Sequence, residues 1–300
     1  MKCYLSLLFS VAIAAFVSVS SLGEEAAKPA AKKITIPANA LTLVVMDPLA
    51  APLSCPCVEG YAQRNYDKLA EFLTAELGRP VVVFYNQSLP AAMKMDTDGR
   101  ADIVIGKHSV VLYDAKKAGL QMRPVVALSG KDGNTHMTGL VLVATADPAK
   151  SVGDLKGYRI FFGTEDSDEK YAAAMSLLTK NGVTPPEKEK AETCVACSDG
   201  ATKLLELGPN VRSATVISSY AAPLLEGCGT IKKGDLRVVG TTEKVPFVEA
   251  FVSQQLAPPE QAKIEAALLK VGTQPELMQA LETLLGFVPI EEPQGSQKKS

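Results

Sequence analysis

Residues 41–46 read LTLVVM and residues 62–77 read AQRNYDKLAEFLTAEL, and these two runs, joined by a loop, decide the fold. The first is a nearly continuous apolar run with β-branched residues, which is typical of a strand buried on both faces of a parallel sheet. In the second, apolar residues recur at helical spacing. A further strand is predicted at residues 80–85. Ligands bind beyond the carboxyl ends of strands in open α/β sheets, so the loop after residue 46 is expected to line a binding crevice.

The same alternation of strands and helices continues along the chain in two rounds, which predicts an α/β fold with two lobes. Each lobe is expected to be a mainly parallel sheet flanked by helices. Two crossings, near residues 141–145 and 245–252, are expected to form a hinge that can close on a ligand. Further strands are predicted at residues 102–105, 122–128, 140–144, 158–162, 191–194, 214–218 and 237–239. Further helices are predicted at residues 89–98, 108–118, 166–181, 199–207, 221–226, 259–271 and 275–285.

The N-terminal residues have the pattern of an export signal. Met1 and Lys2 precede an apolar stretch and then a run of small residues, which predicts a signal peptide and a periplasmic or secreted mature protein. The predicted organisation has five parts: signal peptide 1–23, flexible leader 24–40, lobe 1 at 41–143 and 247–288, lobe 2 at 144–246, and disordered tail 289–300.

Composition and charge exclude several classes of function. The 300 residues are 47% hydrophobic and 21% charged, which is enough apolar material for two full cores. A net charge of -2, with scattered lysines and arginines, provides no basic field for nucleic acid, so none is predicted as a partner. No nucleophile elbow, zinc-hydrolase motif or phosphate-cradling glycine loop occurs, and the protein is not predicted to be an enzyme.

An acidic loop, Gly163-Thr-Glu-Asp-Ser-Asp-Glu169, follows the strand predicted at residues 158–162. Asp166 and Glu169 form a D-x-x-E pattern that predicts the capped start of the next helix, where carboxylates suit the helix dipole. The alternative interpretation of this loop is a seat for a cation.

The order of several segments resembles that of the periplasmic phosphate, phosphite and phosphonate solute-binding proteins of ABC transporters. The segments are residues 41–48, 69–81, 99–103, Gly106 to Ser109, 154–157 (DLKG) and 162–163. This resemblance covers residues 41–269. It implies a type II periplasmic-binding fold that holds a small ligand, a phosphate- or phosphonate-type oxyanion, between the lobes and delivers it to a membrane permease. A monomer is expected.

The resemblance also implies hydroxyl ligands for the oxyanion, namely Ser109, Thr164, Ser167 and Ser198. Four carboxylates lie in the acidic loop beside this seat, and they would repel an anion. The full candidate ligand-binding set is Asp47, Lys107, His108, Ser109, Thr164, Ser167, Ser198, Asp199, Ser219 and Tyr220.

The cysteines leave two alternatives open. Removal of the signal leaves five, an odd number, so at least one thiol cannot pair within the chain. One alternative is one or two structural disulfides. The other is a soft-metal site formed by Cys55, Cys57, Cys194 and Cys197, which lie beyond strand ends that face the crevice.

These alternatives define two further hypotheses. One is a thiol-based sensor or carrier of a soft metal ion or metalloid on the same fold. The other is a thiol-disulfide redox protein that uses Cys194-x-x-Cys197, although the chain contains no Trp and lacks the context of a thioredoxin-like site. No other cofactor is expected.

If the four cysteines form one thiol site, Cys197→Ser should abolish binding of Zn(II), Cu(I) or arsenite by the reduced protein and leave the fold intact. Equilibrium dialysis with each ion measures this, and circular dichroism checks the fold. Equal binding by the variant and the parent, or no binding by the parent, would mean that the cysteines are structural.

Overall fold

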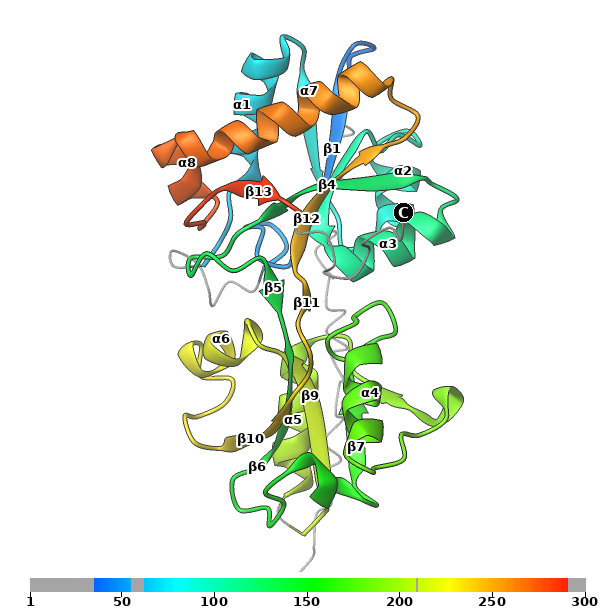
Figure 1. The fold of residues 1–300 in the computed structure, drawn as a ribbon, viewed down its shortest axis with the longest axis vertical. Helices are drawn as coiled ribbons and strands as arrows, with labels where there is room; N and C mark the ends of the chain where they lie inside the picture. Colours follow the sequence, from blue (N-terminus) through cyan, green and yellow to red (C-terminus); the bar gives the residue numbers. More distant parts are fainter. Residues whose placement is uncertain (1–34, 55–61, 209, 291–300) are drawn as a thin grey trace, which may run out of the picture. The chain divides into compact units, whose positions relative to one another are not determined.

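A computed structural model describes residues 35–54, 62–208 and 210–290 (Figure 1). The predicted signal peptide, the first part of the leader, Cys55 and Cys57, and the end of the tail lie outside the described residues. Residues 35–290 belong to one compact unit, which contains two larger sheets.

The first sheet has six strands in the order β13-β4-β12-β3-β1-β2. The β1 strand pairs in parallel with β2 and β3, whereas β12 is antiparallel to β3 and β4, and β13 is antiparallel to β4. The strands are β1 (Leu41–Met46), β2 (Val81–Tyr85), β3 (Ile103–Lys107), β4 (Met122–Leu128), β12 (Val248–Ser253) and β13 (Phe287–Pro289). The accompanying helices are α1 (Tyr66–Leu77), α2 (Leu89–Met95), α3 (His108–Lys117), α7 (Pro258–Leu269) and α8 (Pro275–Ala280), with a 3-10 turn at Lys270–Thr273. We call this sheet and its helices lobe 1.

The second sheet has five strands in the order β10-β6-β9-β7-β8. The β7 strand is parallel to β8 and β9, and β6 is antiparallel to β9 and β10. The strands are β6 (Gly139–Ala144), β7 (Arg159–Phe162), β8 (Glu192–Thr193), β9 (Ser213–Ser218) and β10 (Leu236–Thr241). The helices are α4 (Ala172–Lys180), α5 (Cys197–Leu207) and α6 (Ala221–Gly227), with 3-10 turns at Val152–Leu155 and Lys188–Lys190. We call this sheet and its helices lobe 2. The fold is thus mixed α/β with two helix-flanked sheets, and its parallel pairings lie where the chain alternates strand and helix.

The chain passes between the two sheets twice, and the two passages pair with each other. Strand β5 (His136–Met137) is antiparallel to β11 (Val245–Pro246), and Figure 1 shows both between the larger sheets. Since β6 already belongs to the second sheet, the first passage precedes Gly139, earlier in the chain than the expected residues 141–145. The second passage ends at β12, which returns to the first sheet as the apolar pattern of residues 245–252 indicated.

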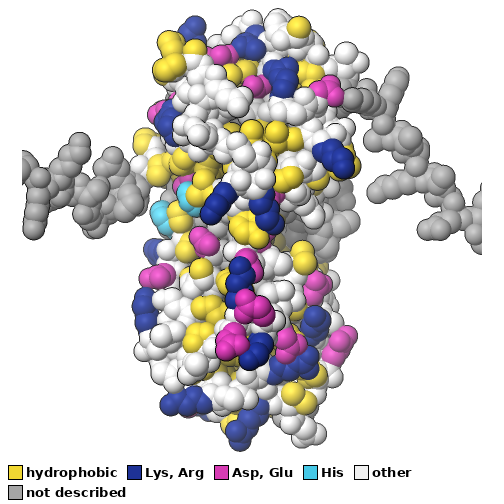
Figure 2. Space-filling model, turned by 90° about the vertical axis from the view of Figure 1, so that its right-hand side faces the viewer, with side chains coloured by type: hydrophobic (Ala, Val, Ile, Leu, Met, Phe, Trp, Pro, Cys, Tyr) yellow, Lys and Arg dark blue, Asp and Glu magenta, His cyan; other side chains and the backbone are white. Residues whose placement is uncertain are grey.

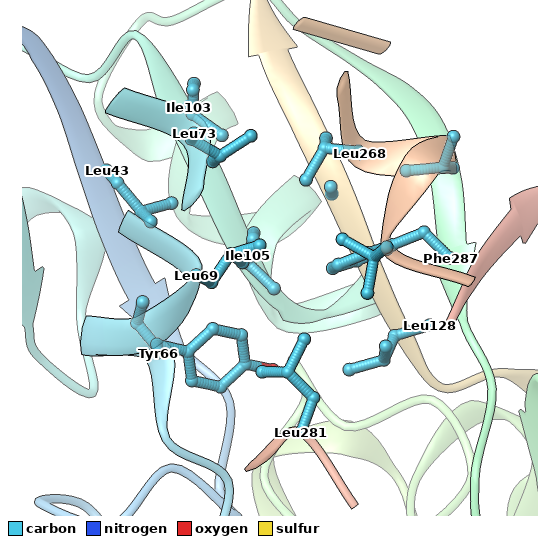
Figure 3. Close-up of a cluster of buried hydrophobic side chains, with 14 of the residues drawn as sticks. Leu43, Tyr66, Leu69, Leu73, Ile103, Ile105, Leu128, Leu268, Leu281 and Phe287 are labelled. Atoms are coloured by element: carbon cyan, nitrogen blue, oxygen red, sulfur yellow. The ribbon is translucent and has the colours of Figure 1, made fainter. Parts of the chain in front are cut away.

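The core of lobe 1 forms because α1 lays its apolar face on the sheet. Figure 3 shows Leu69 and Leu73 of α1 beside Leu43, Ile103 and Ile105 of the strands, and all five are fully buried. Burial of each such side chain contributes about 1.5–3 kcal/mol to folding. Asn65 caps the helix by accepting a bond from the Lys68 N–H. Lobe 2 has a separate core between its sheet and α4.

The helix predicted at residues 166–181 begins later than expected. Helix α4 starts at Ala172, and residues 163–171 form a loop with successive turns, in which Ser167 N–H donates to the Thr164 carbonyl and Lys170 N–H to the Ser167 carbonyl, both at 2.9 Å. The prediction that Asp166 and Glu169 cap this helix is therefore wrong. Instead the turns bury Glu169 completely.

The C-terminal elements also differ from those predicted. The helix expected to reach residue 285 ends at Ala280, and Pro289, the first residue of the predicted tail, lies in β13. Strand β13 forms because Phe287 pairs with Leu128 and buries its ring in the lobe 1 core.

Gly139→Ala should destabilise the protein, because a Cβ atom at Gly139 would lie 2.0 Å from the Glu169 carbonyl oxygen. The loop 163–171 would have to move, and overpacking of this kind costs about 1–3 kcal/mol of the free energy of unfolding. Urea denaturation measures the loss. The matched control is Gly153→Ala, where the nearest atom is 3.6 Å away, and little change is expected. Equal losses in both variants would contradict this close approach.

Candidate functional site

The two lobes meet where β3 ends, at Lys107. The Lys107 Nζ atom lies 2.7 Å from Glu169 Oε1 in the 163–171 loop of lobe 2. The side chain of Lys107 is 7% exposed and that of Glu169 is 0% exposed. The same Oε1 atom accepts a bond from Ser218 Oγ at 2.5 Å, at the end of β9. Three side chains from two lobes therefore form one buried polar cluster.

Burial has the largest effect on the pKa of Lys107. It lowers the pKa of the Lys107 ammonium, and the Glu169 carboxylate opposes that shift. Burial and the negative charge of Glu169 raise the pKa of nearby Asp168, while His108 and Lys107 act in the opposite direction. Charges in the junction therefore interact strongly because little water screens them.

Ser109, at the start of α3, also reaches lobe 2. Its hydroxyl donates to the Asp166 carbonyl at 2.7 Å and accepts from the Asp168 N–H at 3.3 Å. Beside it, His108 Nδ1 lies 2.6 Å from Glu249 Oε2 of β12, within lobe 1. Lys107 and Ser109 thus contact lobe 2, whereas the bond of His108 positions its ring inside lobe 1.

The other predicted hydroxyl ligands bond to the chain itself. Thr164 Oγ1 donates to the Asp166 carboxylate, and Ser167 Oγ lies 3.5 Å from the same oxygen. Ser219 pairs with Thr138 at the passage between the lobes, with a Ser219 N–H to Thr138 carbonyl bond of 2.8 Å.

The remaining predicted polar residues of lobe 2 lie at the start of α5. Ser198 is its second residue and half-buried, and the Asp199 carboxylate accepts from the Ala196 N–H at 3.2 Å. Asp199, the third residue of α5, thus accepts from the N–H of the N-cap residue, as the N3 residue of a capping box does.

Asp47 supports lobe 1 from within. Its carboxylate is fully buried and accepts bonds from Arg64 Nη1 at 2.9 Å, Tyr66 Oη at 2.5 Å and the Leu49 N–H at 2.9 Å. Burial raises the pKa of Tyr66 well above its usual value, and the Asp47 charge adds to this shift. Three donors of lobe 1 therefore hold the Asp47 carboxylate in place.

Tyr220 makes the aromatic contact of the junction. Its ring, just before α6, stacks on that of Phe247 with centroids 4.8 Å apart and planes at 21°. Burial raises the pKa of Tyr220 well above its usual value, with additional contributions from Cys197, Glu169 and Asp47. This tyrosine therefore stays a neutral phenol beside the polar cluster.

The cysteines of lobe 2 are free thiols with different neighbours. Cys194 Sγ lies 3.6 Å from Lys203 Nζ, and Cys197 Sγ accepts from the Ser218 N–H at 3.4 Å. In residues 35–54, 62–208 and 210–290, no group of three or more His, Cys, Asp or Glu side chains is placed to hold a metal. Since Cys55 and Cys57 lie outside the described residues, the four-sulfur site stays a prediction.

A hollow of about 410 Å³ opens between the lobes near the junction. Tyr113 and Lys117 of α3 line one side, and Tyr171 and Lys188 of lobe 2 are among the residues on the other. Basic and acidic side chains are interspersed over the face in Figure 2, with no continuous patch of one sign.

The sequence-based candidate set includes Lys107, Ser109 and Tyr220, which the structure places at the junction, but it lacks three of their neighbours, Glu169, Ser218 and Glu249. Glu169 was assigned to a helix cap because its spacing from Asp166 fits that pattern. The family resemblance left Ser218 and Ser219 as alternatives, and the candidate set contains Ser219. A lone carboxylate in the apolar strand 248–253 was the available signal for Glu249, the partner of His108.

A two-lobed α/β fold with polar side chains from both lobes at the junction defines a solute-binding protein. The model of the family "ABC transporter, phosphonate, periplasmic substrate-binding protein" matches residues 60–296, and the chain belongs to this family. It is a family of transport proteins, not of enzymes, and its members are extracytoplasmic. No helix among the described residues is long and apolar enough to cross a membrane.

Solved structures share this fold. XAC2383 from Xanthomonas citri, bound to ATP, has a TM-score of 0.62 at 17% identity, covering 84% of this chain and 92% of that one. A binding protein component of an ABC phosphonate transporter from Pseudomonas aeruginosa has a TM-score of 0.60 at 13% identity, with 84% and 81% covered. PhnD1 from Prochlorococcus marinus, in complex with methylphosphonate, has a TM-score of 0.60 at 12% identity, with 85% and 93% covered. No curated protein matches the chain.

Asp47→Asn should destabilise lobe 1 strongly, because it leaves the buried Arg64 guanidinium without a counter-charge. Breaking a buried pair in this way costs about 3–5 kcal/mol. The control is Glu260→Gln, whose ion pair with Arg79 is about one-third exposed and should contribute about 1 kcal/mol or less. Urea denaturation of both variants measures the difference. A small loss of unfolding free energy in both variants would show that the Asp47–Arg64 pair is not needed for the stability of lobe 1.

Proposed function

We propose that this protein binds a small oxyanion of the phosphate or phosphonate class between its lobes and delivers it to the permease of an ABC transporter. The observation that carries the proposal is the buried Lys107 ammonium at the carboxyl end of β3, directed at lobe 2. Membership of the phosphonate family supports the ligand class. The methylphosphonate complex of PhnD1, which shares the fold, is consistent with it.

The donors near Lys107 suit an anionic head group. Ser109 supplies a hydroxyl from lobe 1, and Ser218 supplies a hydroxyl from lobe 2. A hydrogen bond that involves a charged group contributes about 1.5–3 kcal/mol. One ammonium and two hydroxyls, drawn from both lobes, therefore form a donor set that suits an anion.

Access to this position requires the lobes to separate, because contacts of Lys107 and Ser109 with lobe 2 close the junction. The paired passages β5 and β11 provide the place where the chain can bend. A monomer is sufficient for this cycle of opening, binding and closure.

Lys107→Met should weaken binding of methylphosphonate, phosphite and inorganic phosphate by about 10- to 150-fold, the equivalent of one lost charged hydrogen bond. Ser109→Ala should weaken it by about tenfold, the lower end of the same range, because the lost hydrogen bond has one charged partner, the anion. Isothermal titration calorimetry of each variant measures both effects.

The control is Lys190→Met, since Lys190 is exposed and pairs with Glu187 on the surface of lobe 2. Its affinities should equal those of the parent. A parent that binds none of these anions at millimolar concentration would rule out this ligand class.

A further inference from the structure

The Lys107 ammonium already has an anionic partner, and that partner belongs to the other lobe. Glu169 Oε1 receives donors from both sides of the junction, Lys107 Nζ at 2.7 Å and Ser218 Oγ at 2.5 Å. An oxyanion between the lobes would use the same two donors. The carboxylate of Glu169 therefore occupies the position that the proposed function gives to the ligand.

The loop holds Glu169 in this position by close packing. The backbone carbonyl oxygen of Glu169 approaches Gly139 so closely that no side chain would fit at position 139. The next residue, Lys170, packs over Gly163 and donates from Nζ to the Val195 carbonyl at 3.2 Å. The loop is thus fixed on both sides of Glu169, and its carboxylate is directed into the junction.

One oxygen of the Glu169 carboxylate lacks a hydrogen-bond donor among the residues that the structure describes. Glu169 Oε2 is buried and makes no hydrogen bond in the described part of the chain. A buried carboxylate oxygen without a hydrogen-bond donor raises the free energy of the closed protein. Opening of the lobes would remove this cost, because water could then reach Glu169. Its pairing with Lys107 works against that opening.

We propose that Glu169 acts as an intramolecular substitute for the anion of the ligand. Its ion pair with Lys107 holds the lobes together in the ligand-free protein. An external oxyanion binds only when it displaces this carboxylate from Lys107 and Ser218. The closing role needs no ligand, whereas the displacement rests on the proposed function.

Glu169→Gln tests the closing role in the full chain without ligand, after extensive dialysis. Small-angle scattering should give a larger radius of gyration for the variant than for the parent. Alkylation of Cys197, half-buried next to Ser218, should become severalfold faster with iodoacetamide, as peptide mass mapping can show.

Glu192→Gln is the matched control, because Glu192 pairs with Arg159 at 2.7 Å inside lobe 2. It should match the parent in both measurements. Ser218→Ala removes only one donor to Glu169 and should give an intermediate result. If circular dichroism shows that Glu169→Gln does not fold, Ser218→Ala serves as the test of the closing role.

A folded Glu169→Gln protein with the radius and alkylation rate of the parent would overturn the closing role. For the displacement, calorimetry with methylphosphonate should show at least tenfold tighter binding by Glu169→Gln than by the parent. Unchanged affinity in an opened variant would overturn the displacement alone. Absence of binding by both proteins would overturn the ligand class and the displacement, while the scattering result would still decide the closing role.

Discussion

The contact on which the site depends is the buried ion pair between Lys107 and Glu169. Removal of two charges from water costs several kcal/mol for each ion, and their attraction recovers that cost only with good geometry. If the lobes part, both charges can regain water, and this offsets part of the attraction between them. The pair can therefore hold the lobes together, but less firmly than a large apolar interface would. A contact of this kind suits the opening and closing that the proposed function requires.

Separate cores allow such movement without loss of the fold. Leu43, Leu69 and Ile105 belong to one cluster in lobe 1, whereas Val141 and Phe162 belong to another in lobe 2. Between the lobes, β5 and β11 pair over only two residues each. Most apolar burial therefore stays within a lobe, and opening exposes chiefly the polar cluster and the stacked rings of Tyr220 and Phe247.

Several polar residues that attract attention in the sequence serve the structure. Asp47 neutralises Arg64 inside lobe 1, Asp199 caps α5, and Thr164 bonds to Asp166. Polar groups near a cleft are partly buried, and burial requires a partner for each of them. A residue type at the expected position is thus insufficient to identify a ligand contact, because the chain itself can supply the partner.

The sequence by itself determined the α/β class, the strand and helix order of residues 41–128, and the family. Apolar periodicity and helix caps are local, and they are visible without the fold. Only the tertiary structure decided the position and partners of Glu169. Its spacing from Asp166 satisfies a helix-capping pattern, but Gly139 and Lys107, 30 and 62 positions away, set its environment. Local patterns contain no information on such partners, because the energy of a buried charge depends on what the fold places beside it.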